Sequence, residues 1–305
     1  MLDQFLRNLV YTEISVGKKK IKFLDMLLAV CITGVGVMIR KSIFGIAGIG
    51  GGTEELLYCA LDFVLAWLMT WFIWKTTENP LKTLGVYALA VIWPAIAANS
   101  AQNGGAEVTG AVVLLIVLCV LATKNIWNRN VFFLFSLLVC NAQILFREEP
   151  LERLTYFWPN IYTLFSETGY VNEYGVTGKF LTLGILLIIL YYISKKKFQA
   201  TPELFVSAGL FLSLLISVFY PFMNYRSGFL ANVFAILMFV QNKKKCYVPM
   251  AMCTISYASY GYFYNTKSVV FFWIYALALV ALMLDAGVSL YRQLHTGKTV
   301  WEKNN

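Results

Sequence analysis

The residues of this sequence best suited to chemistry are glutamates that lie between long apolar stretches. Eight of the sixteen acidic residues fall in connections predicted to share one side of a membrane: Glu54, Glu55, Glu107, Glu148, Glu149, Glu152, Glu167 and Glu173. An acidic face with few arginines suits general-base or metal-assisted chemistry. The same face also arises by default when basic residues are retained on the other side. Because glutamates alone do not distinguish a bound divalent cation from a bare base, the cation stays an open alternative and no metal ligand is assigned.

Ten apolar stretches must position these residues, and each is long enough to cross a bilayer or nearly so. They are 23–40, 57–74, 84–98, 108–123, 131–146, 178–194, 204–220, 227–241, 247–264 and 268–286. A composition that is 59% hydrophobic and 13% charged agrees with this pattern. The sequence therefore predicts an all-α, polytopic integral membrane protein with about ten transmembrane helices.

The basic residues collect in every second connection between these stretches. With a cytoplasmic amino terminus, 18 of the 25 lysines and arginines lie inside and 7 outside, which fixes the predicted orientation by the positive-inside rule. Both termini are then cytoplasmic, in a protein of the plasma membrane. Triplets such as 195–197 suit anionic lipid head groups rather than nucleic acid, so we expect no nucleic-acid partner.

This orientation divides the chain into three parts. The parts are a cytoplasmic segment (1–22), a single transmembrane domain (23–286) and a cytoplasmic tail (287–305). Four outer loops carry most of the polar residues: 40–56, 99–107, 147–177 and 220–227. The third loop is dense in aromatic residues between 154 and 165, which favour the membrane interface and suit a lipid-linked substrate. An aromatic belt without a ligand is the alternative.

Three polar residues lie within predicted spans. Asp62 lies in the middle of the second span, where an ionisable group usually faces a cavity or a partner that the sequence does not name. Asn141 and Gln143 lie in the fifth span, and neutral amides there most often form hydrogen bonds between helices.

Four segments carry motifs in a recognisable order. Residues 99–107 are similar to an Asn-Ser-Ala-x-Trp-Gly-Gln-x-Asp stretch, with Glu107 in place of the aspartate. Residues 141–143 are similar to Lys-x-Gln, and residues 158–162 to a Pro-Asn-Ile-(Trp/Tyr) loop. Residues 221–233 resemble Pro-x-Met-His-Glu-Arg-Tyr-x-x-x-Ala-Asp-Val. In this order the motifs resemble those of GT-C fold, polyprenyl-phosphate-sugar-dependent membrane glycosyltransferases, in particular the bacterial mannosyltransferase-like members.

The resemblance implies an enzyme that transfers a sugar at the outer leaflet from a polyprenyl-phosphate donor to a cell-envelope acceptor. In such a reaction a carboxylate takes the acceptor's proton and a cation holds the departing phosphate. The candidate catalytic residues are Glu54, Glu55 and Glu107. Arg226 is the best phosphate ligand, because a guanidinium matches phosphate oxygens in a two-pronged fork. The other candidate substrate-binding residues are Arg40, Lys41, Asn99, Gln143, Asn160, Tyr162, Asn224 and Tyr225.

Five reactive positions of the family are uncharged here. They are Gly45, Asn141, Asn224, Tyr225 and Asn232, where the family has aspartate, lysine, histidine, glutamate and aspartate. These departures favour an alternative: a non-catalytic GT-C-like scaffold that binds, flips or presents a lipid-linked intermediate. Such a scaffold also suits a subunit of an envelope-assembly complex of membrane proteins.

Overall fold

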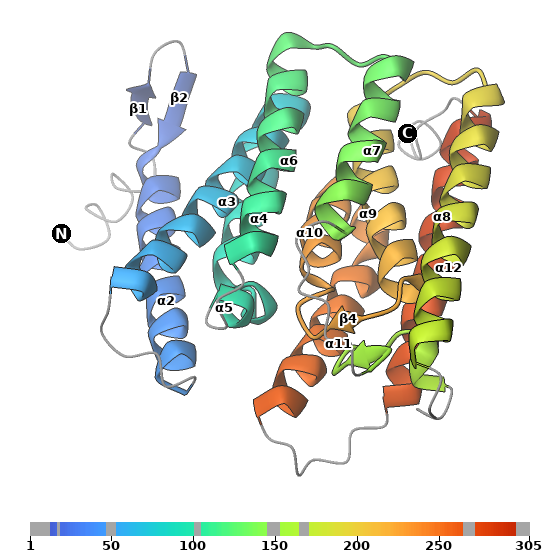
Figure 1. The fold of residues 1–305 in the computed structure, drawn as a ribbon. Helices are drawn as coiled ribbons and strands as arrows, with labels where there is room; N and C mark the ends of the chain where they lie inside the picture. Colours follow the sequence, from blue (N-terminus) through green and yellow to red (C-terminus); the bar gives the residue numbers. More distant parts are fainter. Residues whose placement is uncertain are drawn as a thin grey trace.

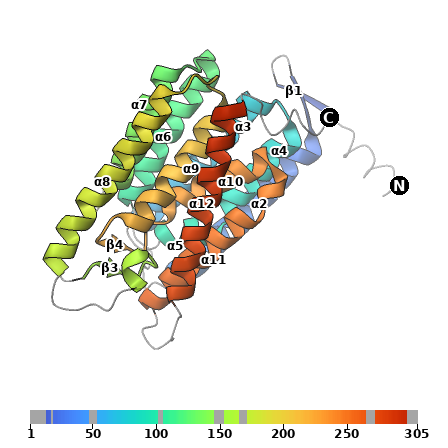
Figure 2. The same ribbon diagram turned by 90° about the vertical axis from the view of Figure 1, so that its right-hand side faces the viewer.

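A computed structural model describes most of the chain, and that part is almost entirely helical. The described residues are 13–16, 19–46, 53–100, 105–144, 153–164, 171–264 and 272–296. Figures 1 and 2 show a bundle in which successive long helices run in opposite directions. The prediction of an all-α protein with membrane-spanning helices is confirmed at this level.

The helices follow one another with short connections. They are α2 (Phe23–Ile46), α3 (Thr53–Thr77), α4 (Pro80–Ile92), α5 (Pro94–Ser100), α6 (Gly105–Lys124), α7 (Arg129–Ile144), α8 (Val171–Lys195), α9 (Pro202–Phe219), α10 (Phe229–Gln241), α11 (Tyr247–Tyr264) and α12 (Phe272–Thr296). Two 3₁₀ turns, η1 (Ile161–Leu164) and η2 (Lys243–Lys245), lie between helices. Strand β1 (Glu13–Val16) pairs antiparallel with β2 (Lys19–Lys22), and β3 (Thr155–Tyr156) pairs in parallel with β4 (Met223–Asn224).

The number of predicted spans is wrong. Six described helices are long and apolar enough to cross a membrane: Phe23–Gly45, Cys59–Thr77, Ala106–Lys124, Glu173–Lys195, Pro202–Phe219 and Phe272–His295. The predicted span 84–98 is the bent pair α4 and α5, which makes a seventh span if the two count as one. Helices α7 and α10 have 16 and 13 residues and are short for a bilayer, and the tyrosine-rich α11 does not join the six.

Proline and capping residues explain where two of the helices begin and where one span breaks. Pro94 restricts the residue before it, and Trp93 is extended (φ −62°, ψ 114°), so the helix ends and restarts with a 47° bend. Asn79 caps α4 by accepting hydrogen bonds from the amides of Leu81 and Lys82, ahead of Pro80 at the first helical position.

Helices α9 and α10 form the centre of the bundle, since almost all their side chains are buried. Helix α9 packs against α7, α10 and α12, and α10 also packs against α4, α5 and α6. Gly209 permits the close approach of α10, because a β-carbon there would lie 2.5 Å from the ring of Phe234. This core links the helices before and after residue 129 into one bundle.

The two ends of the bundle differ in content. The α6–α7 and α8–α9 connections lie at one end in Figure 1, and Lys124, Arg129 and 195–197 lie in these connections or at the helix ends beside them. Helix α5 and strands β3 and β4 lie at the other, which we call the site end. Several helices also extend past the predicted spans, so α2 includes Arg40 and Lys41 and α12 continues into the predicted tail. Which end faces the cytoplasm stays a prediction.

Candidate functional site

An ion pair between Glu107 and Arg226 lies at the site end. Glu107 occupies the first turn of α6, where the helix dipole favours a carboxylate. Arg226 lies in the turn between β4 and α10, and its Nε is 3.6 Å from Oε1 of Glu107. The two side chains are 14% and 16% exposed, so a carboxylate and a guanidinium share one largely buried place. The structure thus brings together a predicted base and the predicted phosphate ligand.

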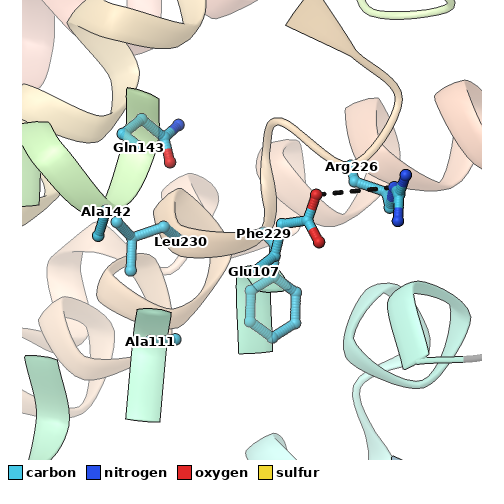
Figure 3. A pocket seen from close by; sticks show the side chains of 7 residues that line it. All are labelled: Glu107, Ala111, Ala142, Gln143, Arg226, Phe229 and Leu230. Carbon is cyan, nitrogen blue, oxygen red and sulfur yellow. Dashed lines mark ion pairs between the residues drawn. The ribbon is translucent and has the colours of Figure 1, made fainter. Parts of the chain in front are cut away.

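A hollow opens beside this ion pair. It is lined by Glu107, Ala111, Ala142, Gln143, Arg226, Phe229 and Leu230 and encloses about 290 Å³ of empty space, part of it open to the surroundings. About 10 Å³ is available to the centre of a water molecule, which is room for about one water. Figure 3 shows the carboxylate of Glu107 turned toward the guanidinium of Arg226, with Ala142, Gln143 and Leu230 on the other side of the view.

The turn that carries Arg226 is held by Asn224. Its Oδ1 accepts hydrogen bonds from the amide of Arg226 at 3.1 Å and from the hydroxyl of Ser227 at 3.3 Å. Such a side-chain bond two residues along stabilises a tight turn. Asn224 also belongs to β4, whose pairing with β3 anchors the turn. Its role here is to position Arg226.

The ring of Tyr225 contacts the guanidinium of Arg226. The Cζ atom of Arg226 lies 5.4 Å from the centre of the Tyr225 ring, a cation–π contact. The Tyr225 ring in turn packs edge-on against Tyr260, with ring centres 5.8 Å apart. Tyr260 donates a hydrogen bond to the Asn99 side chain at 3.2 Å, and Asn99 is fully buried. Asn99 and Tyr225 therefore belong to the packing beneath Arg226.

Gln143 binds neighbouring segments together at the far wall of the hollow. Its Nε2 donates to the hydroxyl of Ser217 and to the carbonyl of Ser227, both at 2.9 Å. These bonds join α7 to α9 and to the turn after Arg226, as expected for an interhelical amide. Asn141 instead donates to the carbonyl of Leu137 in its own helix, so the expectation of a bond between helices is wrong for Asn141.

The aromatic segment predicted to lie on the membrane surface folds inward where the structure describes it. Trp158 is 1% exposed and donates to the carbonyl of Ser217 at 3.1 Å. Asn160 is 1% exposed, and its side-chain oxygen accepts from the amide of Tyr162. The hydroxyl of Tyr162 donates to the carbonyl of Phe219 at 2.9 Å, and burial raises the pKa of Tyr162 to about 12. Trp158 and Tyr162 thus hold the loop against α9, and Asn160 stabilises the turn within the loop.

Two bulky residues beside this loop adopt left-handed backbone conformations. Phe157 has φ 59° and Phe222 has φ 61°, which costs about 1–3 kcal/mol for each such residue. Surrounding contacts compensate: the amide of Phe222 donates to the carbonyl of Leu154 at 2.7 Å, and the ammonium of Lys179 lies 5.1 Å from the Phe222 ring. Strain of this kind is concentrated at functional sites in proteins.

The carboxylate of Asp62 belongs to a second polar network, which is fully buried. The Nε of Arg40 donates to Asp62 at 2.8 Å, and the hydroxyl of Ser100 donates to the other carboxylate oxygen at 2.5 Å. Nη1 of Arg40 also donates to the carbonyl of Val91 at 2.6 Å, so the network ties α2, α3, α4 and α5 together. Arg40 does not line the hollow, and its ion pair with Asp62 joins α2 to α3.

Of three other predicted residues, the structure describes the side chain of Lys41 alone, and Lys41 does not line the hollow. Lys41 is exposed on α2, one position after Arg40. Glu54 and Glu55 lie in the first turn of α3, but their side chains are outside the described part. Within the described ranges no three histidine, cysteine, aspartate or glutamate residues gather to form a metal site. These ranges therefore add no support for a bound divalent cation.

Sequence reasoning missed the apolar side of the hollow. Phe229 and Leu230 begin α10 and Ala111 lies one helical turn after Glu107. The spacing of four between Glu107 and Ala111 is the signal that could have found the small wall residue. Asn232 was noted for its lost charge, but here it accepts from Trp93 at 3.2 Å and donates to Ser256 at 2.7 Å.

In chemical terms, the site offers one carboxylate able to accept a proton and one guanidinium able to hold an anion. The two opposite charges lie 3.6 Å apart in this conformation, so an anionic ligand at the guanidinium competes with the carboxylate. The chain matches no protein-family model, no curated protein and no solved structure.

Proposed function

We propose that this protein binds a polyprenyl-phosphate sugar at the Glu107–Arg226 hollow and transfers the sugar to a hydroxyl of a cell-envelope acceptor. The carrying observation is that the candidate base and the candidate phosphate ligand, both predicted from the sequence, lie 3.6 Å apart in one largely buried place. The predicted topology puts this end of the bundle in the outer leaflet of the plasma membrane.

The reaction begins when the donor phosphate binds Arg226. The phosphate replaces Glu107 as the partner of the guanidinium, so the carboxylate becomes available as a base. Glu107 then takes the proton of the acceptor hydroxyl while the acceptor oxygen bonds to the anomeric carbon. The bond from that carbon to the phosphate oxygen breaks, and the released polyprenyl phosphate keeps the electron pair. Arg226 stabilises the negative charge that develops on the leaving phosphate.

A scaffold that binds the lipid phosphate without transfer is the second candidate. It is favoured by the ion pair between Glu107 and Arg226 and by a hollow with room for about one water. It is also favoured by asparagine and tyrosine at 224 and 225, which position Arg226 and carry no charge. Such a protein would bind, flip or present the lipid-linked sugar, alone or in an envelope-assembly complex.

Donor consumption separates the two candidates. The purified protein in lipid is given a panel of labelled polyprenyl-phosphate sugars, with and without divalent cation, and compared with Glu107→Gln. Glu173→Gln is the matched control, since Glu173 is an exposed glutamate in the first turn of α8.

Transfer or hydrolysis by the wild type and by Glu173→Gln, lost in Glu107→Gln, is the result that the enzyme proposal expects. Saturable binding of the donors with no consumption by any of the three proteins supports the scaffold. Equal turnover in all three proteins refutes the assignment of Glu107 as the base.

A further inference from the structure

A second hollow lies at the end of the bundle opposite the site end. It runs between the start of α4 and the end of α10 and encloses about 510 Å³ of empty space, part of it open to the surroundings. Leu89, Phe239 and Val240 give it an apolar lining, and Gly85 lies along it. A β-carbon added to Gly85 would meet nothing within 4 Å in the described structure, so the groove is empty at that point.

Two lysines lie at the mouth of this groove. Lys82 comes from the first turn of α4 and Lys243 from η2, and both line the hollow. The two ammonium groups interact electrostatically, with Glu203 of α9 as a further charged neighbour of Lys82. Two lysines and one glutamate give the opening of the groove a net positive charge, next to its apolar lining.

We propose that this groove is a binding site for an anionic phospholipid. The phosphate of the head group lies between Lys82 and Lys243, and an acyl chain lies along Gly85 against the apolar lining. Three features point to a lipid: the groove opens at helix ends, where a bilayer places its head groups, its walls are apolar, and its charge is opposite to the ligand's. The site is separate from the Glu107–Arg226 hollow and does not depend on the proposed function.

Ligands of other kinds fit this groove less well. Inorganic phosphate would use the lysines but leave the apolar lining uncovered. A neutral detergent or a zwitterionic lipid would cover the apolar lining but leave the net positive charge at its opening uncompensated. An apolar lining together with a net positive charge therefore favours a lipid with a net negative charge.

The test is a titration of the purified full-length protein with fluorescent phosphatidylglycerol in detergent, with unlabelled phosphatidylglycerol or phosphatidylcholine as competitor. Four variants are compared with the wild type: Gly85→Leu, Lys243→Gln, Lys82→Gln with Lys243→Gln, and Lys124→Gln. Gly85→Leu fills the groove without touching a charge. Lys124→Gln is the matched control, because Lys124 is an exposed lysine at the same end of the bundle. Thermal unfolding of each variant checks the fold.

We expect the wild type and Lys124→Gln to prefer phosphatidylglycerol over phosphatidylcholine by at least about tenfold, since each basic residue near a lipid phosphate is worth about fivefold. Lys243→Gln should weaken binding about fivefold, and the double substitution about 25-fold. Gly85→Leu should bind weakly while unfolding at or above the wild-type temperature. The proposal is overturned if the wild type shows no preference, if Gly85→Leu folds and binds normally, or if Lys243→Gln has no effect.

Discussion

The side chains of Glu107 and Arg226 illustrate how a paired carboxylate and guanidinium serve as a latent site. Their opposite charges attract each other at 3.6 Å, which lowers the cost of keeping both side chains largely buried. The residues that hold them are neutral. Asn224 fixes the turn, Tyr225 contacts the guanidinium, and Gln143 joins α7 to the turn after Arg226. Uncharged residues at 224 and 225 are therefore compatible with the proposed phosphate ligand at 226.

Asn224 offers a test of positioning at the scale of one residue. We expect Asn224→Ala to cost about 1 kcal/mol of stability and to weaken donor binding, because the amide of Arg226 and the hydroxyl of Ser227 lose their acceptor. Asn224→Asp should restore both, since aspartate presents an oxygen at the same place. Thermal unfolding and donor titration measure the two effects. Rescue that fails with aspartate contradicts the positioning role.

The buried Arg40–Asp62 pair predicts strong coupling between two substitutions. Arg40→Met or Asp62→Leu alone should cost about 3–5 kcal/mol, because each leaves one charge buried without its partner. The double variant should be much closer to the wild type in stability, since both charges are gone. Chemical unfolding in micelles measures the cycle. Additive losses in the double variant would show that the two groups act independently.

At the scale of elements, the close packing of side chains against the α8 backbone fixes the position of the 158–162 loop. A β-carbon at Gly178 of α8 would collide with the hydroxyl of Tyr162 and lie 3.3 Å from Pro221. That hydroxyl is fixed by its hydrogen bond to Phe219, so it cannot move away without losing the bond. The α8 backbone at Gly178 and the 158–162 loop therefore define each other's position.

We expect Gly178→Ala to cost about 1–3 kcal/mol of stability, because overpacking displaces Tyr162. Gly184→Ala on the same helix is the control. No described atom lies within 4 Å of its added β-carbon, so the change should be neutral or stabilise the helix by up to about 1 kcal/mol. Thermal unfolding of the two variants gives the comparison. Equal effects of the two substitutions would rule out the collision with Tyr162 as the cause.

Single elements were more predictable from the sequence than their contacts. Apolar runs correctly placed α2, α3, α6, α8, α9 and α12, because a long apolar run has few alternatives to a membrane helix. The bend at Pro94 was missed, although proline there was the available signal. The aromatic run around Trp158 was assigned to the membrane surface, since composition cannot show that the indole finds a buried carbonyl at Ser217.

The candidate site was predictable in its residue types and much less in its pairings. Glu107 and Arg226 were both identified, but their contact depends on how α6 meets the turn before α10, a long-range arrangement without a local signal. The same is true of Asp62, whose partner Arg40 lies on another helix and had been assigned to a loop. A single sequence contains no measure of which polar residues pair across helices.

At the scale of the whole molecule, the lysine-rich connections and the site end lie at opposite ends of the bundle (Figure 1). The positive-inside rule predicts that the site end faces the outside. Cys246 is exposed beside η2, at the opposite end, and is a natural reporter. With the other five cysteines replaced, we expect a membrane-impermeant maleimide to spare Cys246 in intact cells and to label it after permeabilisation.

A cysteine introduced at the exposed Glu173, in a background that lacks the native cysteines, should react in intact cells. If the maleimide labels Cys246 but not the cysteine introduced at position 173 in intact cells, the predicted topology is reversed and the hollow lies on the cytoplasmic side.

The most direct test of the central claim is the donor's dissociation constant measured for the wild type, Glu107→Gln and Arg226→Gln, together with transfer in the same preparations. Arg226→Gln should weaken binding about tenfold or more, because a charge-assisted hydrogen bond to phosphate is lost. Glu107→Gln should bind the donor as tightly as the wild type or more tightly, since the competitor for Arg226 is removed, and should transfer no sugar. Arg153→Gln, an exposed site-end arginine, is the control. Unchanged affinity in Arg226→Gln would contradict the account.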